Sequence, residues 1–162
     1  MANDPRHTTL NGSADYLAAL NTLCSTAGHE LCFFDKNFEG TGFNSELRSQ
    51  LLHDFLLANP SNRLRVLAHD IRHLEQYCPR LLALQRQFGH AVHIYQTPTH
   101  FRHISEPFAV ADSLHYVRRF HFDDLRGILA IEDPEEARKL HAQFEELWSA
   151  SHPALSGSTL GL

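Results

Sequence analysis

Apolar side chains recur every three or four residues in four stretches of the chain, and this spacing predicts amphipathic helices. With their flanking residues, the stretches are Ser13–Gly28, Asn44–Asn59, Asp70–Gly89 and Asp133–Trp148. Small polar residues at the starts, and Gly or Asn at most of the ends, suit helix caps. Pro79 lies inside the third stretch and should kink or split that helix, because proline lacks the amide hydrogen that a helix interior needs.

Short apolar or alternating runs lie between these helices and predict strands. They are His29–Asp35, Arg63–Ala68, Ala91–Tyr95, Pro107–Asp112, His115–Phe122 and Gly127–Ile131. Strands that alternate with helices favour crossover units. We therefore expect one α/β domain over residues 13–151, with a mixed, mostly parallel sheet covered by helices. Residues 1–12 are expected to form a flexible arm and residues 152–162 a loose tail.

The composition is that of a folded globular protein, with 162 residues, 43% hydrophobic and 20% charged. Its net charge of −5 offers no general attraction for nucleic acid or anionic membranes. No apolar run is long enough to span a membrane, and the polar first residues do not resemble an export signal. Cys24, Cys32 and Cys78 form no CxxC pair. We expect buried, reduced thiols and a cytoplasmic location.

Residues 105–151 combine a hairpin, a third strand and a strongly capped helix. Asp133 suits the cap of that helix and Pro134 its first position. This stretch resembles the catalytic module of the phospholipase D superfamily, and the upstream strands and helices are similar to half of that fold. The resemblance covers roughly residues 13–151. The residues that resemble the end of the family's module are Ile131-Glu132-Asp133-Pro134, Ala137, Phe144 and Leu147-Trp148.

In that family the catalytic motif is His-x-Lys followed by four residues and an Asp. The residues of this chain at those positions differ from the motif. If Asp112 matches the aspartate, Ser105 stands at the histidine position and Pro107 at the lysine position. Serine is a poor unassisted nucleophile at phosphorus, and proline has no cationic head. Registers that start at His103 or His100 fail as well. The resemblance therefore implies a degenerate member, similar to bacterial phospholipase D-like domains, that keeps the fold and has lost the chemistry.

Several polar residues near this motif are candidates for binding an anion. They are Arg102, Ser105, Asp112, Arg118, Arg119 and His121. Arginine can grip a phosphate with two N–H groups at once. Neighbours on a strand point to opposite faces, however, so at most one of Arg118 and Arg119 can enter a given pocket.

His69, Asp70 and His73 follow a different strand, at the end where open α/β sheets usually bind ligands. Asp70 also has a simpler interpretation as a helix cap.

The thirteen histidines raise the question of a metal site. His100, His103, His115 and His121 lie closest together in sequence, and imidazoles with a carboxylate such as Asp112 can hold zinc. An H-x-x-H pattern on a loop is weak support for such a site. We expect local hydrogen bonding by these side chains, with no metal and no cofactor.

These observations predict a non-catalytic domain that acts through protein contact or in regulation. A homodimer is expected, because single-copy members of the superfamily resemble half of a pseudo-dimeric enzyme. Two alternatives stay open. One is a phosphodiesterase or nuclease that uses a non-standard histidine, His103 or His115. The other is a module that binds nucleic acid or a phosphate-containing ligand through the region of Arg102, Arg118 and Arg119.

Overall fold

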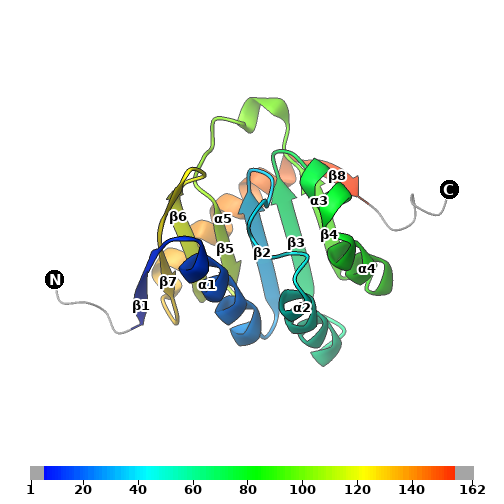
Figure 1. Ribbon diagram of the computed structural model, residues 1–162, viewed down its shortest axis with the longest axis horizontal. Coiled ribbons are helices and arrows are strands. Elements are labelled where there is room, and N and C mark those ends of the chain that lie inside the picture. The colour runs from blue at the N-terminus through cyan, green and yellow to red at the C-terminus, as the bar shows by residue number, and fades with distance from the viewer. Residues whose placement is uncertain (1–5, 156–162) are drawn as a thin grey trace.

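Eight strands form one mixed sheet in the computed structural model, which describes residues 6–155 (Figure 1). The strand order is β1-β7-β6-β5-β2-β3-β4-β8. The strands are β1 His7–Asn11, β2 Glu30–Asp35, β3 Arg63–Ala68, β4 Val92–Gln96, β5 Phe108–Ala111, β6 His115–His121, β7 Asp124–Ala130 and β8 His152–Leu155. The helices are α1 Ser13–Thr26, α2 Glu46–Ala58, α3 Arg72–Tyr77, α4 Pro79–Gln87 and α5 Pro134–Ser149, with a short 3₁₀ turn, η1, at Thr99–Phe101.

The α/β fold class is confirmed, but the expectation of a mostly parallel sheet is wrong. Only the β2–β3 and β3–β4 pairs are parallel, and the other five pairs are antiparallel. Helical crossovers join β2 to β3 and β3 to β4, which makes these three strands parallel. After β4 the chain returns across the end of the sheet and adds β5 antiparallel to β2. Strands β6 and β7 follow as hairpins, and hairpins are antiparallel by construction.

Both edge strands lie in segments for which the sequence predicts no strand. Residues 7–11 of the expected arm form β1, which pairs with β7 in the register His7↔Ala130. Residues 152–155 of the expected tail form β8, and Pro153 is tolerated there because an edge strand needs no amide donor on its outer side. Only Leu10 of β1 is buried, so β1 lacks the alternating pattern of an inner strand. Residues 1–5 and 156–162 lie outside the described part of the chain.

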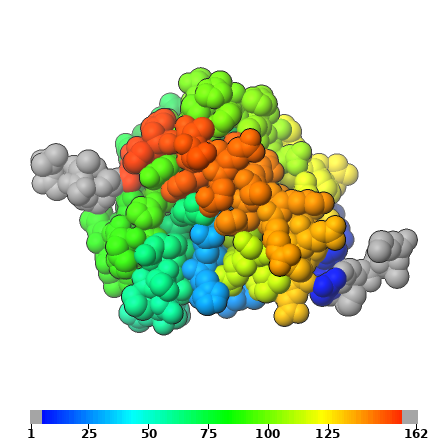
Figure 2. Space-filling view, turned by 180° about the vertical axis from the view of Figure 1, so that it is seen from behind, coloured from blue at the N-terminus to red at the C-terminus, as the bar shows by residue number. Residues whose placement is uncertain are grey.

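Helices cover the two faces of the sheet unequally. Helices α1, α2 and α4 lie on one face, and α5 alone crosses the other (Figures 1 and 2). The first core contains Leu20, Leu52 and Leu81, whereas Phe34 and Phe144 pack beneath α5. Fully burying a side chain of this size contributes roughly 1.5–3 kcal/mol. Among the described residues, no helix is long and apolar enough to cross a membrane.

The ends of the helices agree with the sequence in part. Pro79 splits the third stretch, because α3 ends at Tyr77 and α4 begins at Pro79. Ser45, which follows Asn44 at the start of the second stretch, caps α2, since its hydroxyl accepts a hydrogen bond from the Arg48 amide. Helix α5 does begin after Asp133, but the carboxylate of Asp133 accepts from the Tyr116 hydroxyl instead of capping the helix. This contact ties the start of α5 to β6.

Candidate functional site

A cleft of about 410 Å³ opens at the edge of the sheet where β2, β3 and β6 end. It is lined by Lys36, His69, Asp70, Arg72, Arg102, Ser105, His121, Phe122 and Asp123. Lys36 and His69 each follow directly after a strand of the parallel pair β2–β3. The segment 97–107 brings Arg102 and Ser105, and the end of β6 brings His121. The cleft therefore gathers side chains from four separate segments of the chain.

Backbone hydrogen bonds hold these segments in place. The Phe122 amide donates to the Ser105 carbonyl at 2.9 Å, and the Asp70 amide donates to the Lys36 carbonyl at 2.9 Å. The shape of the cleft thus rests in part on the backbone.

His69 fastens the segment 97–107 to the sheet. Its Nε2 lies 2.7 Å from the Ile104 carbonyl oxygen, which can only accept, so Nε2 carries the proton. Its Nδ1 lies 2.5 Å from the Thr97 hydroxyl. The ring also packs edge-on against Phe34 and Phe122. Burial is the largest cause that lowers the pKa of His69, which favours the neutral ring.

His121 makes a different use of its ring. The backbone amide of Asp123 donates to His121 Nδ1 at 3.0 Å. A neutral ring with Nδ1 as acceptor carries its proton on Nε2. His121 can therefore donate a hydrogen bond to a ligand in the cleft, but its neutral form has no nitrogen lone pair to offer there.

The cationic side chains of the cleft differ in how far they are paired. Arg72 forms a two-pronged ion pair with Asp70, with contacts of 2.6–3.0 Å. These hydrogen bonds from Arg72 lower the pKa of Asp70 to about 2. Lys36 and Arg102 are exposed and have no side-chain partner within the described residues. These two cations are thus free to meet an anion in the cleft.

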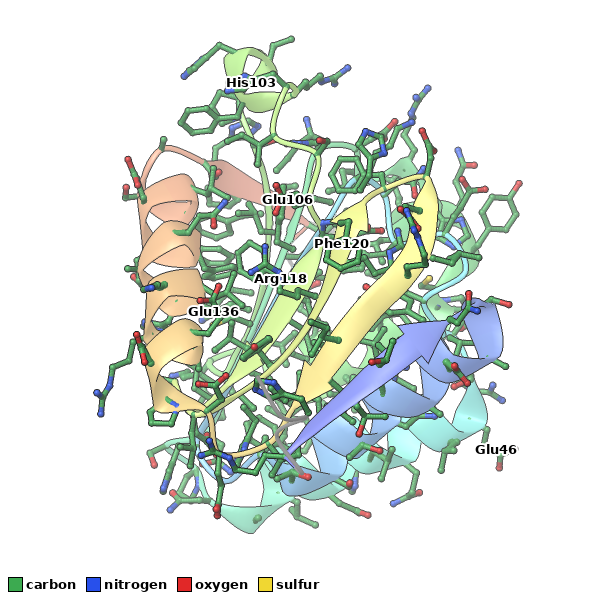
Figure 3. All side chains as sticks on the ribbon, turned by 90° about the vertical axis from the view of Figure 1, so that its left-hand side faces the viewer. Glu46, His103, Glu106, Arg118, Phe120 and Glu136 are labelled. Carbon is green, nitrogen blue, oxygen red and sulfur yellow. The ribbon has the colours of Figure 1, made fainter. Side chains whose placement is uncertain are left out.

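Arg118 and Arg119 lie on opposite faces of β6, and neither lines the cleft. Arg118 faces α5 and forms ion pairs with Glu106 at 3.0 Å and Glu136 at 2.7 Å (Figure 3). Arg119 is buried on the other face, with its guanidinium over the ring of Tyr16. The structure therefore does not bring these two arginines together with Arg102, Ser105 and His121.

Asp112 and His115 lie at the opposite end of the hairpin from the cleft. The carboxylate of Asp112 accepts three backbone hydrogen bonds, from Gly28, His29 and Glu30, at 2.7–2.8 Å. His115 is buried, and its Nδ1 accepts from the amide of Glu132 at 3.0 Å. Both side chains hold the fold together at a distance from any ligand in the cleft.

His100 and His103 lie on the exposed segment above the cleft, and Figure 3 shows His103 at its tip. His103 Nδ1 lies 2.9 Å from the His100 carbonyl oxygen, so its Nε2 is the unprotonated nitrogen. His103 does not line the cleft. The four histidines considered for a metal do not converge among the described residues, since the one group with metal-ligand spacing is Glu30, Cys32 and His141.

Sequence reasoning missed Lys36 and Phe122 as residues of the cleft. A signal for Lys36 was present, because it directly follows a predicted strand of a parallel pair, as His69 does. Phe122 was assigned to a strand, and only the long-range pairing of the Ser105 and Phe122 backbones brings it to the cleft.

Comparisons with known proteins identify the fold. A family model described as a domain of unknown function, DUF7931, matches residues 12–156. No curated protein matches the sequence. Several solved structures are similar, and one of them is that of the archaeal chromatin protein TrmBL2, which shows a novel mode of DNA binding. It has a TM-score of 0.68 at 11% identity, over 94% of this chain and 56% of TrmBL2.

Two further similar structures are those of a phospholipase D family member and of a phosphatidylserine synthase. Nuc from Salmonella typhimurium, a phospholipase D family member, has a TM-score of 0.66 at 9% identity, over 93% of this chain and 99% of Nuc. Phosphatidylserine synthase from Haemophilus influenzae Rd KW20 has a TM-score of 0.67 at 13% identity, over 94% of this chain and 40% of the synthase. At such identities the likeness shows the fold alone. The predicted phospholipase D-like fold is confirmed.

Proposed function

We propose that this chain, which belongs to the DUF7931 family and has a phospholipase D-like fold, binds phosphate-containing ligands in its cleft without cleaving them. The observation that carries the proposal is the hydrogen bonding of the two imidazoles in the cleft. Both ring nitrogens of His69 are engaged by the protein, and His121 directs an N–H group outward. Neither ring offers the lone pair that attack at phosphorus requires.

The positions of Ser105 and Pro107 support the same conclusion. Ser105 lines the cleft, but no imidazole there is placed to accept its proton. Pro107 is buried and has no charge with which to stabilise a phosphoryl oxygen. A ligand held in the cleft would therefore meet cations, hydrogen-bond donors and the carboxylates of Asp70 and Asp123, but no imidazole placed to act as a nucleophile or to activate Ser105.

Lys36 and Arg102 supply the affinity. A hydrogen bond to a charged group contributes about 1.5–3 kcal/mol, and the His121 N–H group adds a third donor. After the cost of association, we expect dissociation constants on the order of 0.1–1 mM for one phosphate group. A ligand with several phosphates binds more tightly and with strong salt dependence. DNA is such a ligand, and TrmBL2 is a DNA-binding protein of similar fold.

The test is fluorescence anisotropy with a labelled single-stranded oligonucleotide at low ionic strength. We expect binding that weakens as salt is added, and a loss of about tenfold or more in the double variant Lys36→Gln/Arg102→Gln. The matched control is Arg138→Gln/Lys139→Gln, which removes the same charge from the exposed side of α5 and should change the affinity less than about twofold. Equal losses in the two variants would mean that the cleft is not the binding site.

A second assay addresses catalysis. We expect no turnover of bis(p-nitrophenyl) phosphate above the buffer rate. His103 is the informative residue, because its Nε2 carries the free lone pair. Turnover that disappears in His103→Ala would overturn the non-catalytic assignment and establish a phosphodiesterase that uses His103.

A second function is homodimer formation. It is favoured by the part of the sheet that α5 leaves uncovered on the face where α5 packs. Helix α5 packs across β5, β2 and β6, beside a groove of about 420 Å³ over β6, β7 and the end of β1. Phe120 and Ile128 line this groove, and Phe120 is 50% exposed. Arg118, Glu135 and Glu136 supply charges of both signs, so a second copy can present complementary groups.

Sedimentation equilibrium tests the dimer. We expect a dimer for the unmodified chain and a weakened one for Phe120→Ser. Leu57→Ser is the control, since Leu57 is equally apolar and 65% exposed but lies on α2, on the opposite face. A monomer at all concentrations would remove self-association from the proposal and leave ligand binding untouched.

A further inference from the structure

A second cluster of polar side chains lies beneath α5, separate from the cleft. It contains Glu30 and Cys32 from β2 and His141 from α5, whose ligand atoms all lie within 4.8 Å of one another. Glu145 extends the cluster, since its Oε1 lies 3.7 Å from His141 Nε2. A thiol, an imidazole and two carboxylates form a donor set typical of zinc and related divalent ions.

Two rigid elements position these four groups. Glu30 and Cys32 are two residues apart on β2 and therefore share one face of the strand. His141 and Glu145 are four residues apart on α5 and share one face of the helix. Because α5 packs against β2, the two pairs face each other. Each pair is set by secondary structure, so the cluster needs no loop to form it.

The guanidinium of Arg65 occupies the centre of this cluster. Its Nη2 lies 3.0 Å from Glu30 Oε2 and 3.6 Å from Cys32 Sγ, and it also hydrogen-bonds to Glu145. The Nε of Arg65 is buried and has no hydrogen-bond partner among the described residues. The cluster thus already attracts a cation, and the buried Nε shows that the guanidinium itself is incompletely satisfied there.

We propose that Glu30, Cys32, His141 and Glu145 form a binding site for a divalent transition-metal ion of the zinc class, from which Arg65 withdraws when the ion enters. Ligand atoms around one tetrahedral zinc ion lie roughly 3.3–3.6 Å apart. The ligand atoms of Glu30, Cys32 and His141 lie within 4.8 Å of one another, so side-chain rotation on binding must bring them and Glu145 closer together. Binding breaks the S–H bond of Cys32, forms a sulfur–metal bond and releases the proton to the buffer.

Access and charge agree with this site. The side chains of Glu30 and His141 are 29% and 27% exposed, so an ion can enter from solvent, with Cys32 beneath them. Two carboxylates and a thiolate bring three negative charges to a divalent ion. Arg65 can remain stacked on Phe144 and Trp148, where its positive charge still opposes the bound ion.

The test is a titration of the chelator-treated protein with Co²⁺, in which a thiolate ligand gives a sulfur-to-cobalt absorption band in the near ultraviolet. This signal separates the site from the exposed histidines, which give no such band. We expect one equivalent of Co²⁺, displaced by Zn²⁺. Cys32→Ser should abolish the band, whereas Cys78→Ser, a buried thiol in the other core, should keep it. Circular dichroism confirms that both variants are folded.

Arg65 provides the sharpest check. A unit charge about 8 Å from a divalent ion lowers the affinity for that ion about fivefold even at the dielectric constant of water. Arg65→Gln should therefore tighten Co²⁺ binding about fivefold or more, and His141→Ala should weaken it about tenfold or more. Absence of the band in the unmodified chain, or its persistence in Cys32→Ser, would overturn the proposal.

Discussion

Asp112 anchors the turn between β5 and β6 to the start of β2, and its removal is expected to be among the most damaging changes on the protein surface. Its carboxylate accepts from the amides of Gly28, His29 and Glu30 at 2.8, 2.7 and 2.8 Å. Hydrogen bonds to a charged acceptor contribute about 1.5–3 kcal/mol each, but Gly28 and His29 are exposed and water can partly replace the acceptor. The three bonds together are therefore expected to contribute about 2–3 kcal/mol.

The backbone of Asp112 adds a second term. Its φ of 58° lies in the left-handed region, where alanine costs roughly 1–2 kcal/mol and glycine costs little. Asp112→Ala should thus lower the free energy of unfolding by about 3–5 kcal/mol, and Asp112→Gly by about 1–2 kcal/mol less. Asp112→Asn keeps one acceptor oxygen and should lose about 1–2 kcal/mol.

Urea unfolding followed by circular dichroism measures these values, with the m-value expected to stay unchanged. Asp123→Ala is the control, because the side chain of Asp123 is 88% exposed and its removal should cost less than about 0.5 kcal/mol. A loss below about 1 kcal/mol in Asp112→Ala would refute the anchoring role. Equal losses in the alanine and glycine variants would refute the backbone term.

Two further predictions concern the cleft and the hairpin. Burial lowers the pKa of His69 in the folded chain, so its contribution to stability is complete above about pH 6.5 and is lost as the pH falls from there toward the folded value. Urea unfolding at pH 7.5 and 5.5 should show a smaller pH effect in His69→Phe than in the unmodified chain, with the exposed His29→Gln as control. At Gly127, an added Cβ would lie 2.1 Å from the Arg118 carbonyl oxygen, so Gly127→Ala should cost roughly 3 kcal/mol or more. Gly89→Ala, whose nearest contact would be 3.5 Å, should leave the thermal midpoint nearly unchanged.

The inner elements could be predicted from the sequence because their signals are local. Strand β3 has the predicted bounds Arg63–Ala68. Pro79 divides two helices because proline lacks the amide hydrogen that a helix interior needs. Edge strands carry weaker local signals. The partners of β1 lie more than 100 residues away in β7, and a pattern with one buried residue does not indicate a strand.

The direction of the strands needed information that the pattern of helices and strands does not contain. Helical crossovers set the direction of β2, β3 and β4. No local sequence signal, however, indicates that β5 pairs with β2. The cluster of Glu30 and His141 illustrates the same limit, because these residues are 111 positions apart and meet only when α5 packs on the sheet. The faces of Arg118 and Arg119 could be foreseen, since neighbours on a strand diverge, but their partners could not.

The contacts around the cleft and along the hairpin show which groups hold this architecture together. Phe122 and Ser105 meet through backbone atoms, and Asp112 binds backbone amides at the far end of the hairpin. His69 uses both ring nitrogens to hold the segment that crosses the cleft. None of these interactions uses the side chain of Ser105 or Pro107. Likeness of fold therefore carries no information on turnover here, and the free charges of Lys36 and Arg102 are the features of the cleft on which a function can still rest.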